Sequence, residues 1–212
     1  MRNFCDSVGS VTVIGAVSPQ GSDFSEPVTQ NTKRFTRCFW ALDKNLAYAR
    51  HYPAVNWITS YSEYFKDLDP WYLKNVGEDF VKLRKRIVDI LREEERLMEI
   101  VKLVGEDVLP DDQKLSIEAA KLVRFGFLQQ NAFHKEDTFV PLKKQQEMMR
   151  VIVYLYDKVK SLIMASIPMS SVVKLGLFSD LAKMKYDIPN DNLDKINDYF
   201  VKIDSQIEKM VS

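Results

Sequence analysis

The side chains that most often carry chemistry in enzymes are sparse in this sequence and stand apart from one another. The two histidines, His51 and His134, are far apart and have no partner at the spacing of zinc ligands. The two cysteines, Cys5 and Cys38, form no CxxC pair, which fits a reducing compartment better than a disulfide framework. We therefore expect no metal site and two free thiols.

Two runs of adjacent acids, Asp111-Asp112 and 93–95, are the strongest candidates for acid–base chemistry. Adjacent residues on a helix point apart, so neither run forms a close carboxylate dyad, and exposed charge on a helix explains both. The sequence contains no GxxxxGK[ST] phosphate loop, no GxGxxG, no HExxH and no GxSxG. We expect no catalytic residue among these positions.

The composition is that of an ordinary soluble protein with balanced charge. Thirty basic and 30 acidic residues cancel, and 46% of residues are hydrophobic. The dense basic run at 82–86 is followed at once by mixed charges, which indicates a solvated helix face rather than a nucleic-acid site. The start is short and polar, and the most apolar helical stretch, 151–167, carries three charged residues. We expect a cytoplasmic protein without membrane insertion.

The first third of the chain has β-type runs broken by glycine and proline. Residues 11–17 read VTVIGAV, which is apolar on both faces and predicts a buried strand of a parallel sheet. A second strand is predicted within 34–40, and Asp43 is placed to cap a short helix through Tyr48. Two strands cannot close a doubly wound domain, so this third is interpreted as the edge of a larger sheet.

The rest of the chain is helical. Apolar residues recur every three or four positions from 80 to 104, along ~25 residues or ~37 Å of helix, and Gly105 ends the pattern. The stripe consists of Phe80, Leu83, Ile87, Ile90, Leu97, Val101 and Val104. Four further helices are predicted to start at Leu109-Pro110, at Pro141, at Ser170 or Ser171, and at Asn190 or Asp191. The fold class is therefore mainly α: a helical bundle preceded by a partial α/β segment.

Three segments carry blocks that composition and periodicity do not explain. Residues 9–57 contain SP-x-G-x-DFSEPVT and FWALD, and residues 127–133 read FLQQNAF. These segments resemble the catalytic A subunits of archaeal- and vacuolar-type rotary ATPases. The HYPAVN block also resembles YPAVD in the related bacterial and mitochondrial β subunits, whose acidic rotor-facing motif corresponds to residues 105–115. The resemblance covers residues 9–212 and is weakest in the last forty.

The resemblance implies a division into three parts. Residues 1–8 are set apart as an unmatched leader, 9–65 resemble the end of a RecA-like nucleotide-binding domain, and 66–212 resemble the helical, rotor-facing domain. In this family an aromatic pocket from both domains holds the adenine ring of ATP or ADP. The positions that match are Tyr52, Phe127, Gln130 and Phe133. Flat apolar rings can sandwich a base, but packing of the bundle against the sheet is the alternative for Tyr52 and Phe127.

Two further site assignments follow from the resemblance. The loop containing Ser18 and Asp23 corresponds to one near the γ-phosphate, although a capped turn explains it equally well. The residues expected to face the central stalk are Val108, Leu109, Pro110, Asp111 and Asp112. This tip is less acidic than in β subunits, so we expect the stalk contact to depend on shape and apolar packing.

In the full subunit, the resemblance implies a phosphate loop and Mg²⁺ partners upstream of these residues, and an arginine finger from a neighbouring B subunit. We therefore expect this chain alone neither to hydrolyse ATP nor to bind it tightly. Two alternatives stay open: a stand-alone helical module that docks on stalk or B subunits, and a non-catalytic B subunit. An exposed strand at 11–17 would also favour a dimer through its edge.

Overall fold

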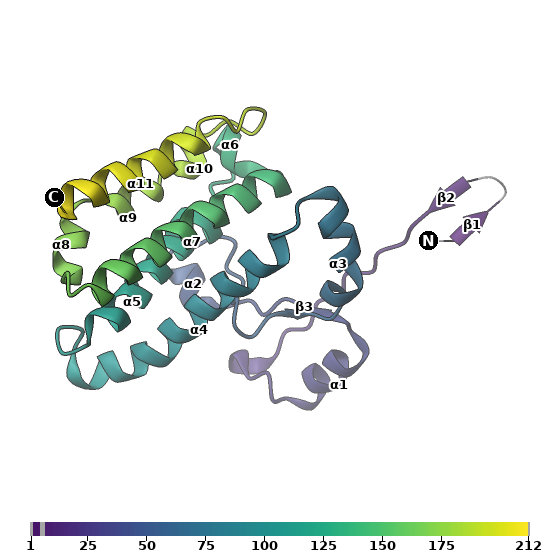
Figure 1. Ribbon diagram of the computed structural model, residues 1–212. Coiled ribbons are helices and arrows are strands. Elements are labelled where there is room, and N and C mark those ends of the chain that lie inside the picture. Colours follow the sequence, from purple (N-terminus) through teal and green to yellow (C-terminus); the bar gives the residue numbers. More distant parts are fainter. Residues whose placement is uncertain (1, 5–6, 212) are drawn as a thin grey trace.

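Helices α4 (Phe80–Val104), α5 (Asp111–Val123) and α7 (Leu142–Met164) form the centre of the fold, as the computed structural model shows (Figure 1). The structure describes residues 2–4 and 7–211. These helices pack against one another and supply most of one hydrophobic core. The prediction of a mainly α fold is confirmed.

The apolar stripe predicted for α4 faces this core. Five of its members are buried: Phe80, Leu83, Ile87, Ile90 and Leu97. The stripe divides near its end, because Leu97 joins Leu109 and Ile117 in a second cluster beneath the turn between α4 and α5. Gly105 ends α4 as predicted, with a positive φ of 85° that a side chain would strain.

Helix α5 does not stop at Val123 but widens into a π-helical turn, η2 (Arg124–Leu128). Gly126 in this turn is buried, and a Cβ there would lie 2.9 Å from the Cα of Ala182 and 3.1 Å from a Leu122 methyl. The close approach of two backbones therefore requires glycine at this position. Beyond η2 the chain leaves the bundle as a loop that runs to α6 (Lys135–Thr138).

The predicted fourth helix is in fact two short helices, α8 (Met169–Lys174) and α9 (Leu177–Leu181). They are separated by Gly176, whose φ of 72° is left-handed. Neither Ser170 nor Ser171 caps α8. The first N–H of α8, on Met169, instead donates to the carboxylate of Asp111 at 3.1 Å. A cap supplied from 58 residues away is invisible to a local pattern.

The last helix, α11 (Ile196–Val211), also starts later than predicted. Asn190 is not its cap, because its backbone N–H donates to the Glu136 carboxylate at 2.7 Å and its amide donates to Phe139 O at 2.8 Å. These bonds tie residue 190 to the region around α6. Between α9 and α11 lies the short helix α10 (Met184–Asp187).

The first third of the chain departs most from the prediction. Residues 11–17 form no strand in the described structure, and Val11 and Val13 are 92% and 89% exposed. No described strand lies beside this segment, and it leads to the β1 (Arg2–Phe4) and β2 (Ser7–Gly9) hairpin, away from the bundle (Figure 1). The predicted buried strand is wrong, and a dimer through residues 11–17 stays a prediction.

Residues 20–75 form short elements beside the bundle. The predicted strand at 34–40 shrinks to β3 (Cys38–Phe39), which pairs antiparallel with β4 (Tyr61–Ser62). The other elements are η1 (Gln20–Ser22), α1 (Pro27–Phe35), α2 (Lys44–Tyr48) and α3 (Tyr64–Asn75). The predicted cap of α2 is confirmed, since Asp43 accepts bonds from the N–H groups of Asn45 and Leu46.

The described chain offers no metal cluster and no membrane span. Its His, Cys, Asp and Glu side chains nowhere gather in a group of three that could hold a metal ion. None of its helices combines the length and apolar character needed to cross a membrane. Cys38 has a free thiol, whereas Cys5 lies outside the described residues.

The close approach at Gly126 gives a first prediction. Gly126→Ala should lower the free energy of unfolding by about 1–3 kcal/mol, because the added methyl meets the Ala182 backbone, which cannot move aside cheaply. Urea unfolding followed by circular dichroism measures the change. Gly15→Ala is the matched control, since no heavy atom lies within 4 Å of its added Cβ. Equal stability of the two variants would contradict the packing assigned to η2.

Candidate functional site

The segments that carry Tyr52 and Gln130 lie side by side although they are far apart in sequence. The backbone N–H of Gln130 donates to Tyr52 O at 2.7 Å, and the Gln129 side chain donates to Arg50 O at 3.2 Å. Two of the residues predicted for the adenine pocket are thus joined by a main-chain bond. The end of the first family-like segment and the loop after η2 are therefore in direct contact.

His51, next to Tyr52, is buried and packs against both its own segment and η2. Its ring is only 4% exposed, its Nε2 lies 3.0 Å from Arg124 O, and it packs against Trp57 and Phe125. Arg124 in turn pairs with the buried Glu94 of α4 at 2.8 Å. Burial raises the pKa of Glu94 despite this partner. No local pattern in the sequence indicates that His51 has a packing role rather than a chemical one.

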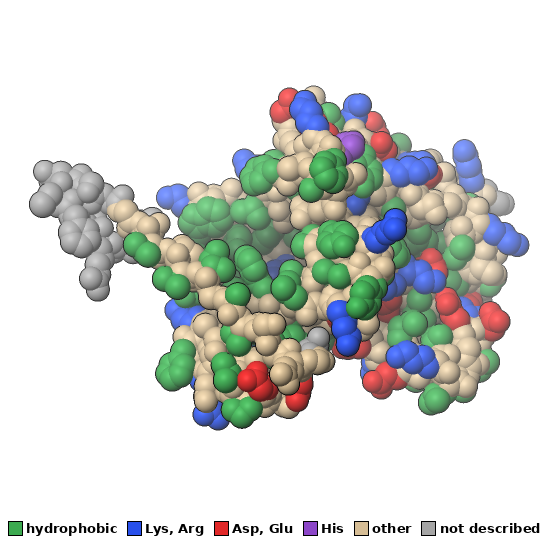
Figure 2. Space-filling view, turned by 180° about the vertical axis from the view of Figure 1, so that it is seen from behind, with side chains coloured by type: hydrophobic (Ala, Val, Ile, Leu, Met, Phe, Trp, Pro, Cys, Tyr) green, Lys and Arg blue, Asp and Glu red, His purple; other side chains and the backbone are tan. Residues whose placement is uncertain are grey.

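The predicted aromatic residues differ in how they meet solvent. Phe133 is fully exposed and Tyr52 is 54% exposed, whereas Phe127 packs partly buried against the main core. Gln130 is exposed, with its amide 3.4 Å from Asp137 O. The packing alternative therefore fits Phe127, while the rings of Tyr52 and Phe133 are free to meet a ligand. Figure 2 shows a face on which apolar side chains gather beside the N-terminal segment.

A buried ion pair stands behind the loop that carries Gln130. Lys185 and Asp137 are 3% and 1% exposed, with Nζ and Oδ2 3.5 Å apart. Lys185 Nζ donates to Gln129 O at 2.5 Å, and Asp137 Oδ2 accepts the N–H of Asn131 at 2.7 Å. The pair therefore forms hydrogen bonds with the main chain on both sides of Gln130.

A second buried lysine, Lys144 of α7, joins α10 to α6. Its ammonium is enclosed by four oxygen acceptors at 2.6–3.3 Å: the carbonyls of Glu136, Lys185 and Ile188, and Asn190 Oδ1. Burial lowers the pKa of Lys144, opposed by Glu136 and Asp137. Sequence reasoning missed this residue, although its spacing from Met148 and Ile152 places it on the apolar face of α7.

Ser18 and Asp23 lie in the turn before α1. Ser18 is exposed, and Asp23 accepts bonds from the N–H and hydroxyl of Ser25 at 2.9 and 2.6 Å. These bonds lower the pKa of Asp23. Within the described residues, no hydrogen bond or ion pair joins this turn to Tyr52 or Gln130.

Comparison with known proteins places this arrangement in a family. Residues 2–62 match the ATP synthase alpha/beta family, nucleotide-binding domain, and residues 69–172 match the C-terminal domain of V and A type ATP synthase. The first match takes in most of the segment 1–8 that we set apart. The chain is 56% identical over 205 residues to the V-type ATP synthase alpha chain of Halothermothrix orenii, covering 97% of this chain and 35% of that one.

Other relatives agree. The chain is 54% identical to V-type ATP synthase alpha chain 2 of Clostridium tetani, covering 100% of this chain and 36% of the relative. It is 47% identical to the A subunit of the A-type ATP synthase of Methanopyrus kandleri, covering 97% and 35%. The chain belongs to the alpha (A) subunits of V- and A-type ATP synthases. It corresponds to their C-terminal portion and spans about a third of the length of these relatives. The resemblance found in the sequence is confirmed.

A solved structure shares the fold at greater distance. The ATP synthase subunit NeqB of Nanoarcheaum equitans superposes with a TM-score of 0.55 and 20% identity, covering 65% of this chain and 34% of that chain. At this identity the likeness shows the fold alone. The relatives that are 47–56% identical are named alpha or A, which leaves the alternative of a B subunit without support.

In this portion of the alpha chain, the predicted stalk-facing tip divides between exposed and internal residues. Val108 is 71% exposed, and Pro110 and Asp112 are exposed as well. Leu109 is buried in the second core cluster, and Asp111 caps α8. A pocket of about 540 Å³ lies beside the tip, lined by Glu106, Asp107, Asp111, Lys114, Glu118, Met169, Ser170, Val173 and Lys174.

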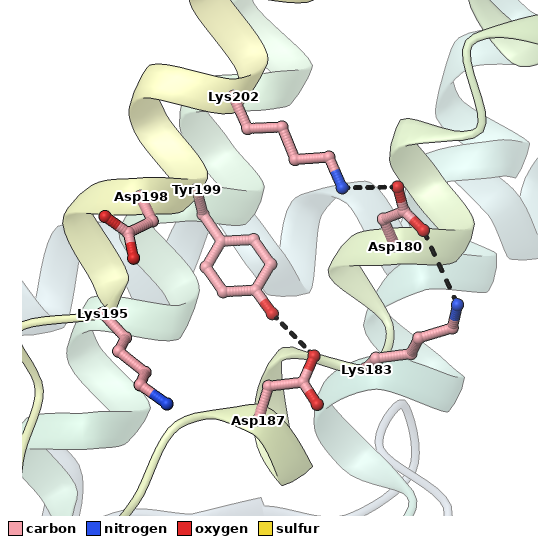
Figure 3. A pocket seen from close by; sticks show the side chains of 7 residues that line it. All are labelled: Asp180, Lys183, Asp187, Lys195, Asp198, Tyr199 and Lys202. Atoms are coloured by element: carbon pink, nitrogen blue, oxygen red, sulfur yellow. Dashed lines mark hydrogen bonds and ion pairs between the residues drawn. The ribbon is translucent and has the colours of Figure 1, made fainter.

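Another pocket, of about 380 Å³, lies where α11 meets α9 and α10 (Figure 3). Its lining residues are Asp180, Lys183, Asp187, Lys195, Asp198, Tyr199 and Lys202. Asp180 lies 2.6 Å from Lys202 Nζ and 3.6 Å from Lys183 Nζ, and the Tyr199 hydroxyl donates to Asp187 at 3.0 Å. The bond from Lys202 lowers the pKa of Asp180, and burial raises the pKa of Tyr199. These side chains are paired with one another, so the residues that line the pocket hold α11 against α9 and α10.

The roles of the two adjacent acids at the tip can be separated. Asp111→Ala should lower the free energy of unfolding by about 0.5–2 kcal/mol, because it removes the acceptor at the start of α8. Asp112→Ala is the control, since both acids lie in the first turn of α5 and affect its dipole equally. Urea unfolding measures both variants. A larger loss in Asp112→Ala would refute the cap assigned to Asp111.

Proposed function

We propose that this chain forms the adenine side of the nucleotide site, and a rotor-facing tip, in the catalytic A subunit of an ion-translocating rotary ATPase. The phosphate-binding loop, the Mg²⁺ ligands and the water-activating acid would come from the remainder of the subunit. B subunits and central-stalk subunits are the proposed partners, on the cytoplasmic head of the complex. Coupling of ATP hydrolysis or synthesis to ion transport is then a property of the assembly.

One observation carries the proposal. The main-chain bond between Gln130 and Tyr52 joins the part matched to the nucleotide-binding domain with the part matched to the C-terminal domain. Tyr52, which accepts this bond, and Phe133, three residues after Gln130, both carry solvent-exposed aromatic rings. A base stacked on such rings gains ~1–3 kcal/mol per contact without any phosphate ligand. The same two matches support the proposed domains 9–65 and 66–212.

The tip between α4 and α5 is proposed as the stalk contact. Its surface residues, Val108, Pro110 and Asp112, are carried on two packed helices above the second core cluster. A rigid helical hairpin of this kind can transmit closure of the nucleotide site to a rotating shaft through shape, without specific ion pairs. The loop with Ser18 and Asp23 is proposed as a neighbour of the phosphates only.

Adenine binding by this chain should be weak, local and independent of Mg²⁺. Stacking of ~1–3 kcal/mol on each of two rings sums to ~2–6 kcal/mol, which corresponds to dissociation constants between tens of millimolar and tens of micromolar. In ¹H–¹⁵N spectra, ADP at tens of millimolar should therefore shift the amide signals of Tyr52 and residues 130–133. The chain should show no ATP hydrolysis.

Two variants test whether the response to ADP depends on the Phe133 ring. Phe133→Ser should weaken the response to ADP, whereas Phe139→Ser should leave it unchanged, because Phe139 is also exposed but lies beyond α6. Shifts confined to other regions would refute the adenine site. Mg²⁺-dependent ATPase activity in a clean preparation would refute the assignment of catalysis to the remainder of the subunit.

A further inference from the structure

The buried charges behind the loop 129–131 are arranged toward its backbone. Lys185 Nζ donates to Gln129 O, and Asp137 Oδ2 accepts the N–H of Asn131. The residue between these two contacts is Gln130, whose own N–H donates to Tyr52 O. Three consecutive residues are therefore fixed through their main chain, while Gln130 is exposed at the surface and its side-chain amide donates to Asp137 O at 3.4 Å.

Stability alone does not account for this arrangement. Taking an ammonium and a carboxylate out of water costs several kcal/mol per ion, and apolar pairs of similar volume often stabilise a fold at least as well. What an apolar pair lacks is a donor for Gln129 O and an acceptor for the Asn131 N–H. The ion pair is specific for a defined loop conformation.

The contacts of Lys144 extend this arrangement to α7. Lys144 Nζ donates to the carbonyls of Lys185 and Ile188 at 2.9 and 2.6 Å, and so fixes both ends of the segment that carries Lys185. The loop is thereby connected, through α10, to the long helix at the centre of the bundle. A displacement of α10 would move Lys185 Nζ away from Gln129 O.

We propose that Lys185, paired with Asp137, is a positioning residue for adenine recognition. It sets the main-chain conformation of residues 129–131 so that Gln130 meets the edge of the base and Tyr52 its face. This inference rests on the proposed adenine site. It makes the preference for adenine over other bases dependent on a side chain that does not touch the nucleotide.

The test uses the 212-residue chain with Lys185→Met, and ADP and UDP as probes. Loss of a charged hydrogen bond should weaken ADP binding about tenfold and bring the ratio of UDP to ADP dissociation constants toward one. Exchange of the Gln130 and Asn131 amide hydrogens should accelerate, while amides in α7 keep their protection. Lys185→Arg should retain the adenine preference.

Two further variants serve as controls. Lys183→Met removes an exposed lysine from the residue next to α10 and should change neither binding nor exchange. Lys185→Met with Asp137→Asn leaves no unpaired buried charge, so it should fold while the loop stays loosened. If neither Lys185→Met variant folds, Lys185 is a structural residue and the proposal is overturned.

The outcomes separate the two proposals. Unchanged amide exchange, or an unchanged UDP to ADP ratio in a folded Lys185→Met variant, overturns the positioning role. If the unmodified chain shows no response to ADP at residues 52 and 130–133, the adenine site itself fails. The exchange rates then still decide whether Lys185 holds the loop.

Discussion

The need to satisfy backbone groups that lose their helical partners where α5 ends shapes the rest of this structure. After the π-helical turn η2 the chain leaves the bundle, and the carbonyl of Gln129 and the N–H of Asn131 have lost the partners that a helix would supply. Lys185 and Asp137 take over that role at the expense of burying two charges. Lys144 does the same for the ends of α10. Polar groups inside the bundle, rather than its apolar stripes, thus define where the loop lies.

This constraint gives the C-terminal elements a part in the site. The match to the C-terminal domain family ends at residue 172, and the resemblance in the sequence is weakest over the last forty residues. Yet α10 carries Lys185, and α11 covers the core with Ile196, Ile203 and Ile207. The ion pair between Asp180 and Lys202 holds α11 against α9. The part of the chain that lies beyond this family match is the part that supports the loop beside Tyr52.

Local patterns predict what local forces determine. The periodic stripe of α4, its end at Gly105 and the Asp43 cap of α2 all depend on residues a few positions apart. The strand prediction for residues 11–17 is wrong because a buried strand needs neighbouring strands, and no described strand accompanies them. The cap of α8 comes from Asp111, on another helix. Lys144 and Lys185 look like surface charge in the sequence, because burial of a lysine depends on acceptors that only the fold assembles.

The candidate site has a physical signature that sequence motifs alone do not describe. Its backbone is fastened at Gln129, Gln130 and Asn131, whereas the rings of Phe133 and Tyr52 are left in solvent. A packing surface would instead bury its aromatic side chains, as the partly buried Phe127 illustrates. Exposed aromatic rings on a rigid main chain lose little conformational entropy when a flat ligand stacks on them. In the proposed site, buried charges hold the loop backbone, so the weak gain of stacking would not be offset by ordering of the loop. This is why the lysines behind the loop, and not the rings alone, belong to the proposed account of base recognition.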